Sequence, residues 1–342
     1  MLELDSIRFS YGQTPVLNDV SFEARSGMVT CLVGPSGCGK STLLRLAAGL
    51  LPMQGGEIRI DTRLVAGLHL HVSPEQRSVG LVFQEGALFP HLNALQNIRF
   101  GLRGDAPVDR VDELLEMTDL VGLADRYPDE LSGGQRQRVA LARALAPEPR
   151  VLLFDEPYAH LDQALSRQLR EATRRLVAEL DTVAVFVTHD GDDIAELADT
   201  VVTMTDGEIV QSGSPRELFD HPLHLNVARL FGQTQRLSAH KTGDRLETPF
   251  GPWRAECLAV PVQQDGPLDL HVRPDGLAAT PDPDGLQVSE LRLAGADDLV
   301  GVRGKDGAML FVRVGRPHDI QPGGRVVLWP LQARVFPQVA VD

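Results

Sequence analysis

The sequence has few cysteines and a shortage of positive charge. The three cysteines among 342 residues, Cys31, Cys38 and Cys257, are too few for a disulfide framework and lack the spacing of metal ligands. They fit a reducing cytosol, where buried free thiols are common. The formal net charge of −14 argues against a broad phosphate-binding surface, so we expect no nucleic-acid partner. A local anion site needs only a few backbone amides and is compatible with this charge.

Long apolar runs are missing as well. No stretch reaches the roughly eighteen uncharged apolar residues that a membrane-spanning helix needs. Glu3 and Asp5 stand near the start of the chain, which is unlike a secretory signal peptide. We therefore expect a protein that stays in the cytosol unless a partner holds it at a membrane. The length suggests about two domains.

Residues 1 to about 233 alternate between strand-like and helical patterns. Short apolar or β-branched runs, typical of strands, occupy 57–60, 78–83, 150–157, 182–190 and 200–213. Helical periodicity is present over 41–50, 110–120, 133–146, 163–180 and 191–198. This alternation predicts an α/β domain with a largely parallel sheet.

Helical periodicity fades in the last part of the chain, residues 234–342. Strand-like runs separated by Gly, Pro and Asp occupy 268–274, 286–295, 308–315 and 325–336. This pattern predicts a second, small all-β domain, built as a barrel or a sandwich.

A glycine-rich stretch, "GPSGCGKST", covers residues 34–42 and matches the pattern G-x-x-x-x-G-K-[ST]. It follows an apolar run and precedes a helical pattern, which is the strand–loop–helix context that a phosphate-binding loop requires. Its glycines let the backbone curl around a phosphate at the positive end of the helix. Lys40 is predicted to reach the phosphates and Ser41 to bind Mg²⁺. The predicted nucleotide-binding residues are Gly34, Pro35, Ser36, Gly37, Cys38, Gly39, Lys40, Ser41 and Thr42. A glycine-rich turn with a chance lysine is the simpler alternative, which the flanking patterns disfavour.

A buried-looking strand, "VLLFDEP" at 151–157, ends in two carboxylates. Isolated buried carboxylates are costly, so this pair is expected to face a cation or a polar ligand. We assign Asp155 to Mg²⁺ binding and Glu156 to polarising the attacking water. A structural salt-bridge pair is the alternative.

The stretch "LSGGQRQRVALARAL" at 131–145 predicts a helix that begins weakly. Two glycines, each unfavourable in a helix interior, precede strong helix-forming residues. Ser132 is a suitable N-cap, and glycines leave amide groups exposed at the positive helix end. We interpret this start as a place where backbone N–H groups approach an anion; a helix start without a ligand is the alternative.

Taken together, these stretches resemble the nucleotide-binding subunit of an ATP-binding-cassette (ABC) transporter. "GPSGCGKST" is similar to the Walker A motif, "VLLFDEP" to Walker B and "LSGGQ" to the more specific ABC signature, over residues 2 to 233. The resemblance implies a P-loop NTPase cassette at 1–233, with a helical subdomain at about 85–150. It also implies an ATPase in which two copies pack head to tail. The signature residues of one copy then bind the γ-phosphate held by the other: Ser132, Gly133, Gly134 and Gln135.

Four further positions match family elements. Tyr11 matches the aromatic residue that stacks on adenine, and Gln84 matches the glutamine that contacts Mg²⁺ and the attacking water. His189 matches the switch histidine, which touches the γ-phosphate and orients Glu156. Asp162 matches the aspartate of the D-loop, which packs across the dimer. Ala159 stands where this loop more often has Ser, so one cross-dimer hydrogen bond is expected to be missing.

The resemblance also implies partners and a place in the cell. The cofactors are ATP and Mg²⁺, and the partners are a second copy, integral-membrane permease subunits and, indirectly, a solute-binding protein. The subunit is then peripheral, at the cytoplasmic face of the inner membrane. Phe89 and Leu92, in "ALFPHL", are candidate contacts with the permease. Residues 234–342 resemble the OB-like regulatory domain of importers for sugars, polyamines, sulfate, molybdate and ferric iron.

The cargo expected from the sequence is ferric iron. "FQEGALFPHL", with Glu85 and Gly86 after the glutamine, is most similar to the ferric-iron subgroup. Polyamine, sugar, sulfate or molybdate import is the alternative. A soluble cassette ATPase that acts on ribosomes or DNA is a remote alternative, since this acidic chain has one cassette and no long heptad run. The third alternative is a degenerate cassette that serves as a scaffold. The presence of Lys40, Glu156 and His189 argues against it.

Overall fold

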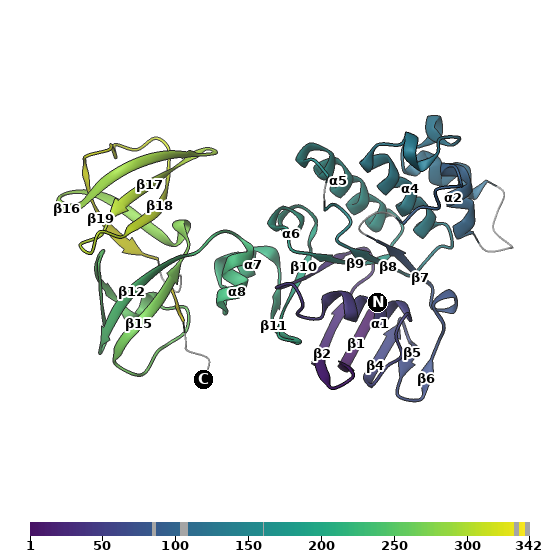
Figure 1. The fold of residues 1–342 in the computed structure, drawn as a ribbon, viewed down its shortest axis with the longest axis horizontal. Helices are drawn as coiled ribbons and strands as arrows, with labels where there is room; N and C mark the ends of the chain where they lie inside the picture. The colour runs from purple at the N-terminus through teal and green to yellow at the C-terminus, as the bar shows by residue number, and fades with distance from the viewer. Residues whose placement is uncertain (84–86, 103–108, 160, 332–334, 339–342) are drawn as a thin grey trace. The chain divides into compact units, whose positions relative to one another are not determined.

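The computed structural model describes residues 1–83, 87–102, 109–159, 161–331 and 335–338. The chain divides into two compact units, Met1–Pro215 and Arg216–Asp342. The first unit is mixed α/β and the second contains mostly strands (Figure 1). This is the fold class that the sequence predicted. The division lies before residue 234, where we placed the start of the second domain.

The main sheet of the first unit has six strands in the order β11-β10-β3-β9-β8-β7. All neighbouring pairs are parallel except β10 and β11, which form an antiparallel hairpin. Its central strands are buried on both faces, as their apolar runs require. Its members are β3 (Val29–Val33), β7 (Val79–Val82), β8 (Val151–Asp155), β9 (Val183–Thr188), β10 (Thr200–Thr205) and β11 (Glu208–Gly213).

A second sheet of the first unit is entirely antiparallel, in the order β2-β1-β4-β5-β6. We did not predict its first two strands as a pair. Bulges interrupt the pairing of β1 with β2, so the alternation of buried and exposed residues is broken and the period-two signal is weak. The strands are β1 (Leu2–Tyr11), β2 (Thr14–Ala24), β4 (Gly55–Ile60), β5 (Arg63–Gly67) and β6 (Leu70–His71).

The helices of the first unit are divided between two layers (Figure 1). Helix α1 lies between the two sheets, where Leu43, Leu44 and Leu46 share one apolar core with residues of both sheets. The α2, α4 and α5 helices lie on the other side of the main sheet. The bounds are α1 (Lys40–Ala48), α2 (Ala94–Gly101), α3 (Arg110–Met117), α4 (Gly133–Leu145), α5 (Gln163–Glu179) and α6 (Gly191–Leu197).

The second unit contains two antiparallel sheets around a single core. One sheet has the order β14-β13-β12-β15-β20 and the other the order β18-β17-β16-β19. Strand β16 continues through Pro281 and Pro283, which we expected to separate strands; its pairing with β19 shifts register between Pro281 and Leu286. The strands are β12 (Gln235–Thr242), β13 (Arg245–Thr248), β14 (Gly251–Arg254), β15 (Gly266–Val272), β16 (Leu277–Ala294), β17 (Asp297–Arg303), β18 (Met309–Gly315), β19 (Arg325–Pro330) and β20 (Val335–Gln338).

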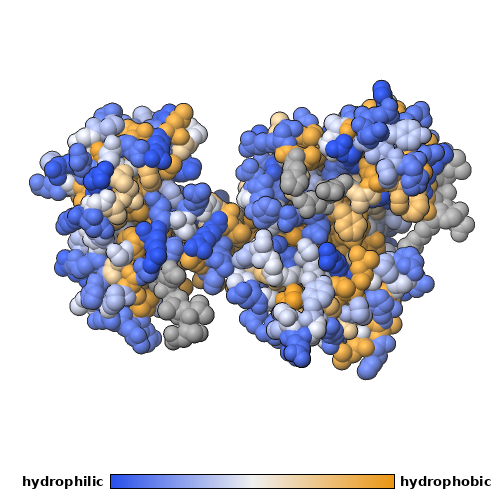
Figure 2. Space-filling view, viewed as in Figure 1, coloured by the Kyte–Doolittle hydropathy of each residue, from blue (hydrophilic) through white to orange (hydrophobic). Residues whose placement is uncertain are grey.

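Two short helices, α7 (Pro215–Asp220) and α8 (Leu225–Leu230), precede the strands of the second unit. Single 3-10 turns occur at Pro74–Gln76, Val121–Leu123, Pro128–Glu130, Ala255–Cys257 and Pro274–Gly276. In the part of the chain that the structure describes, none of the helices has both the length and the apolar character to cross a membrane. On the face of each unit seen in Figure 2, hydrophilic side chains predominate and apolar ones form scattered patches.

Candidate active site

Three adjacent strands of the main sheet bring the predicted catalytic loops to one edge. The phosphate loop follows β3, Glu156 follows β8 and His189 follows β9. The strands are parallel, with Val33 paired to Thr188 and Asp155 to Val187, so all three loops emerge from the same end of the sheet. This is the edge at which open α/β sheets bind ligands.

The phosphate loop is shaped by glycines whose backbone conformations suit no other residue well. Gly34, Gly37 and Gly39 all have positive φ, and a Cβ at Gly34 would collide with the carbonyl oxygen of Met204. Lys40 is 7% exposed, and its Nζ donates hydrogen bonds to the carbonyl oxygens of Gly34 at 2.8 Å and Pro35 at 2.9 Å. The loop therefore encloses a cation at the start of α1, an arrangement suited to a phosphate.

Ser41 and Asp155 meet beside this loop. The Ser41 hydroxyl donates a hydrogen bond of 3.1 Å to Oδ1 of Asp155. Both side chains are half-buried and offer oxygen atoms, which are the ligands that Mg²⁺ prefers. The residues present thus fit a Mg²⁺ ion. Gln84, the third predicted metal ligand, lies outside the described residues.

Glu156 and His189 are in direct contact. Nδ1 of His189 lies 3.3 Å from Oε2 of Glu156. Glu156 has a left-handed backbone with φ of 48°, which is rare for a residue with a side chain and occurs at functional sites. Its amide donates to the carbonyl oxygen of Val187 at 3.0 Å. The side chain of Glu156 is 29% exposed and that of His189 is 68% exposed, so both are open to a reacting ligand.

Helix α4 begins at the predicted position with a complete capping box. The Oγ of Ser132 accepts the N–H of Gln135 at 3.3 Å, and Oε1 of Gln135 accepts the N–H of Ser132 at 2.9 Å. A Cβ at Gly133 would lie 2.9 Å from Leu161, and one at Gly134 would lie 2.6 Å from Leu165. Close packing on these leucines is therefore a second reason for both glycines, beside the ligand approach inferred from the sequence.

The other predicted positions lie on separate elements. Tyr11 ends β1; it is 47% exposed and packs edge-on against Phe9, with ring centroids 5.0 Å apart. Asp162 is the N-cap of α5, because its Oδ1 accepts the N–H of Leu165 at 2.9 Å. The amide of Ala159 donates to the carbonyl oxygen of Glu156 at 3.3 Å. Glu85 and Gly86, on which the cargo expectation depends, lie outside the described residues.

The candidate permease surface is organised by an asparagine that the sequence analysis did not single out. Asn97 is completely buried in α2, and its Oδ1 accepts the N–H of Phe89 at 2.9 Å. Its Nδ2 donates to the carbonyl oxygens of Phe89 at 3.2 Å and Leu92 at 2.9 Å. Phe89 also packs on the exposed Phe100, with ring centroids 4.4 Å apart. Only the fold reveals this role, since the sequence places no special pattern around Asn97.

A cavity of about 380 Å³ lies next to Glu156 and His189. Its wall also includes Arg170 of α5 and Asp193 of α6, neither of which the sequence analysis identified. Arg170 is one of four arginines in α5, and nothing in the local sequence distinguishes it from the others. Its burial, at 3% exposure, is decided by the packing of α5 on α6.

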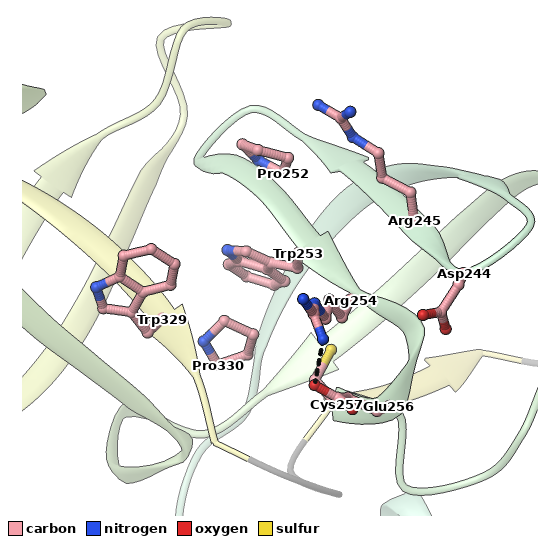
Figure 3. A pocket seen from close by; sticks show the side chains of 9 residues that line it. All are labelled: Asp244, Arg245, Pro252, Trp253, Arg254, Glu256, Cys257, Trp329 and Pro330. Carbon is pink, nitrogen blue, oxygen red and sulfur yellow. Dashed lines mark ion pairs between the residues drawn. The ribbon is translucent and has the colours of Figure 1, made fainter.

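The second unit has a separate pocket of about 860 Å³. Trp253, Trp329 and Pro330 lie close together, whereas Asp244 and Arg245 lie apart from them at the right of the view (Figure 3). The indole N–H of Trp253 is buried without a hydrogen-bond partner among the described residues. None of the predicted nucleotide-binding residues lies in the wall of this pocket.

Residues 17–159 match the family model described as "ABC transporter". Among curated proteins, the chain is 43% identical over 282 residues to the sulfate/thiosulfate import ATP-binding protein CysA of Salmonella typhi, covering 80% of this chain and 76% of that protein. It is 41% identical over 307 residues to the Fe(3+) ions import ATP-binding protein FbpC 1 of Rhodococcus jostii, covering 88% of this chain and 87% of that protein.

A solved structure supports the same relationship. It is titled as a dimeric, post-hydrolysis state of an ATP-binding cassette bound to ADP and Pi. The chain aligns to it with a TM-score of 0.54 and 32% identity, over 63% of this chain and 99% of that one. The likeness therefore concerns a part of this chain about as large as its α/β unit.

Proposed function

The chain belongs to the ABC transporter family as the ATP-binding subunit of an importer, and we propose that two copies of it hydrolyse ATP to drive the uptake of ferric iron. The observation that carries the proposed hydrolysis is the joint placement of Ser41, Asp155, Glu156 and His189 beside the phosphate loop. A binding module without hydrolysis has no need of a carboxylate and an imidazole in contact at this edge.

The geometry supports a separate role in ATP hydrolysis for each of these residues. The phosphate loop and Lys40 bind the phosphates, while Ser41 and Asp155 hold Mg²⁺, which neutralises phosphate charge when bound. Glu156 accepts a proton from the attacking water. His189 orients the Glu156 carboxylate, which it contacts at 3.3 Å. Gln84 completes the metal and water contacts in this proposal, and Tyr11 stacks on the adenine.

Two copies are required because each chain has one phosphate loop and one signature segment. In the proposed dimer, Ser132, Gly133, Gly134 and Gln135 of one copy bind the γ-phosphate held by the other, and Asp162 packs across the interface. The exposed Ser132 and the half-buried Gly133 and Gln135 at the start of α4 suit this contact, whereas Gly134 is buried. The dimeric state of the solved cassette described above supports the arrangement.

The remaining proposals concern partners, location and the second domain. Phe89 and Leu92 contact a membrane permease, and the subunit works at the cytoplasmic face of the inner membrane with a solute-binding protein upstream. Residues 1–233 form the cassette, and the all-β part, 234–342, acts as a regulatory domain. The strong acidity of the chain supports a protein partner over DNA or RNA.

Sulfate is the second candidate cargo, because the 43% identical relative is named for sulfate and thiosulfate import. The two can be separated in a strain that lacks the gene and is complemented with wild type or Glu156→Gln. Uptake of ⁵⁵Fe(III) and of ³⁵S-sulfate is measured side by side. We expect only wild type to restore iron uptake, with sulfate uptake equal in all strains.

The outcomes distinguish cargo from mechanism. Restoration of sulfate uptake in place of iron uptake would reassign the cargo and leave the ATPase role intact. Restoration by Glu156→Gln as well as by wild type would contradict the role of hydrolysis. The purified protein assayed for phosphate release from Mg-ATP checks the same point without a cargo.

A further inference from the structure

The catalytic imidazole of His189 is not held by packing. Its side chain is 68% exposed, yet Nδ1 lies within 3.3 Å of the Glu156 carboxylate. An exposed side chain at the end of a strand keeps such a position only if the backbone on both sides of it is fixed. The hydrogen bonds of its two neighbours, Thr188 and Asp190, therefore show how the position of His189 is fixed.

Both neighbours of His189 are tied to the start of α6. The Thr188 hydroxyl donates to Oδ2 of the buried Asp193, and it accepts the N–H of Asp190 at 3.0 Å. Oδ1 of Asp190 in turn caps α6 by accepting the N–H of Asp192 at 2.9 Å. The short loop 188–190, which we call the switch loop, is thus anchored through Asp193.

Asp193 is itself held by Arg170 of α5. Nε of Arg170 lies 2.6 Å from Oδ1 of Asp193, and the two side chains are only 4% and 6% exposed. The same guanidinium contacts Glu196 at 3.1 Å and Asp190 at 3.5 Å. Burial raises the pKa of Asp193, although the bonds from Thr188 and Arg170 act in the opposite direction. Burial would lower the pKa of Arg170, but the bonds to Asp193 and Glu196 raise it.

Helix α5 also begins at the D-loop. Asp162 caps its first turn, and Arg170 lies about two turns further along the same helix. Leu165, between them, is the residue that packs closest to Gly134 of the signature helix. The α5 helix therefore begins at the D-loop, packs on the start of α4 and contacts the switch loop.

We propose that Arg170 is a positioning residue for ATP hydrolysis: through Asp193 and Asp190 it holds the switch loop on α5, and so keeps His189 against Glu156. This inference rests on the proposed ATPase function. It adds a residue that acts through other side chains, and it makes α5 the element that connects the D-loop to the switch histidine of the same subunit.

The test compares Arg170→Lys with Arg174→Met. Lysine keeps the charge and loses the fork that reaches three carboxylates. Arg174 lies one turn further along α5, is half-exposed, and pairs with Asp199 at 2.7 Å without reaching the switch loop. We expect Arg170→Lys to lower kcat about 10- to 100-fold while changing the affinity for Mg-ATP less than about twofold. Arg174→Met is expected to stay within about twofold in both.

A double mutant separates positioning from general damage. In a His189→Ala background, Arg170→Lys should lower kcat no further, because the residue it positions is already gone. A further loss as large as that in wild type would overturn the proposal, as would a folded Arg170→Lys enzyme with normal kcat. If Arg170→Lys does not fold, Asp193→Asn takes its place with the same expectations. An inactive wild type would instead contradict the proposed function.

Discussion

The phosphate loop and the switch loop lie side by side at one sheet edge, but they are held in different ways. The phosphate loop depends on its backbone, with glycines at positive φ and a lysine bonded to carbonyl oxygens. The switch loop depends on charged side chains, through Asp193 and Arg170. A loop that presents backbone amides to an anion is held by its backbone conformation. A loop that positions one exposed side chain needs hydrogen bonds or ion pairs that fix the residues on both sides of it.

Two buried arginines show the same contrast. Arg77 is 1% exposed and donates to the carbonyl oxygens of Leu46 at 2.6 Å, Ala47 at 3.1 Å and Val72 at 2.7 Å. It thereby satisfies the end of α1, the helix that begins in the phosphate loop, and burial lowers its pKa to about 10. Arg170, by contrast, forms its ion pairs with the carboxylates of Asp190, Asp193 and Glu196. Arg77 is therefore expected to matter for stability, and Arg170 for turnover.

The largest expected effect comes from Glu156→Gln, which separates the two regions by function. Hydrolysis should fall by at least about 100-fold, because the amide cannot accept the proton of water. Binding of Mg-ATP should persist, because the phosphate loop is unchanged. The variant should then accumulate as an ATP-dependent dimer, measured by gel filtration with and without Mg-ATP. A variant that stays monomeric at every protein concentration would contradict the two-copy site.

A smaller effect is expected from two glycine variants, one of which places a Cβ against backbone and the other against a side chain. Gly34→Ala should weaken ATP binding by more than about 10-fold, because its Cβ meets the backbone of Met204, which cannot move aside. Gly134→Ala meets only the side chain of Leu165, so ATP binding by the monomer should stay within about twofold while hydrolysis falls. Adding Leu165→Ala should then restore part of the hydrolysis. Fluorescent nucleotide titration and phosphate release report the two quantities, and equal loss of binding in both variants would abolish the distinction.

The smallest effect on catalysis is expected from Arg77→Met. Removing the guanidinium takes a buried donor from two carbonyl oxygens of α1, those of Leu46 and Ala47, and from the carbonyl oxygen of Val72, so the free energy of unfolding should fall by about 2–3 kcal/mol. The kcat of the folded fraction should stay within about twofold, because the substituted side chain does not line the site. Denaturant unfolding followed by steady-state kinetics measures both. Arg63→Met, at an exposed position with one bond to the carbonyl oxygen of Gln76, is the matched control. Normal stability together with lost turnover in Arg77→Met would reverse the assignment of the two arginines.

Much of the fold could be predicted from local patterns. The helices at 133–145 and 163–179 lie within a residue of the expected ranges, because each has an N-cap and a sustained helical period. The buried strands at 151–155 and 183–188 were visible as continuous apolar runs. The bulged β1 and β2 were not, since their irregular pairing removes the alternation on which strand prediction depends. Of β16, only the part after Pro283 was predicted, at 286–295, because the two prolines and the register shift interrupt the pattern of the first part.

The sequence by itself predicted the chemistry of the site, because two short segments place Lys40 and Ser41 in a phosphate-binding context and Asp155 and Glu156 at the end of a strand. Only the tertiary structure decided which residues support that chemistry. Arg167, Arg170, Arg174 and Arg175 look alike along α5, yet only Arg170 among them is buried, since it alone faces Asp193 across the contact with α6. Burial and charge pairing across elements are properties of the packed chain, and no local pattern carries them.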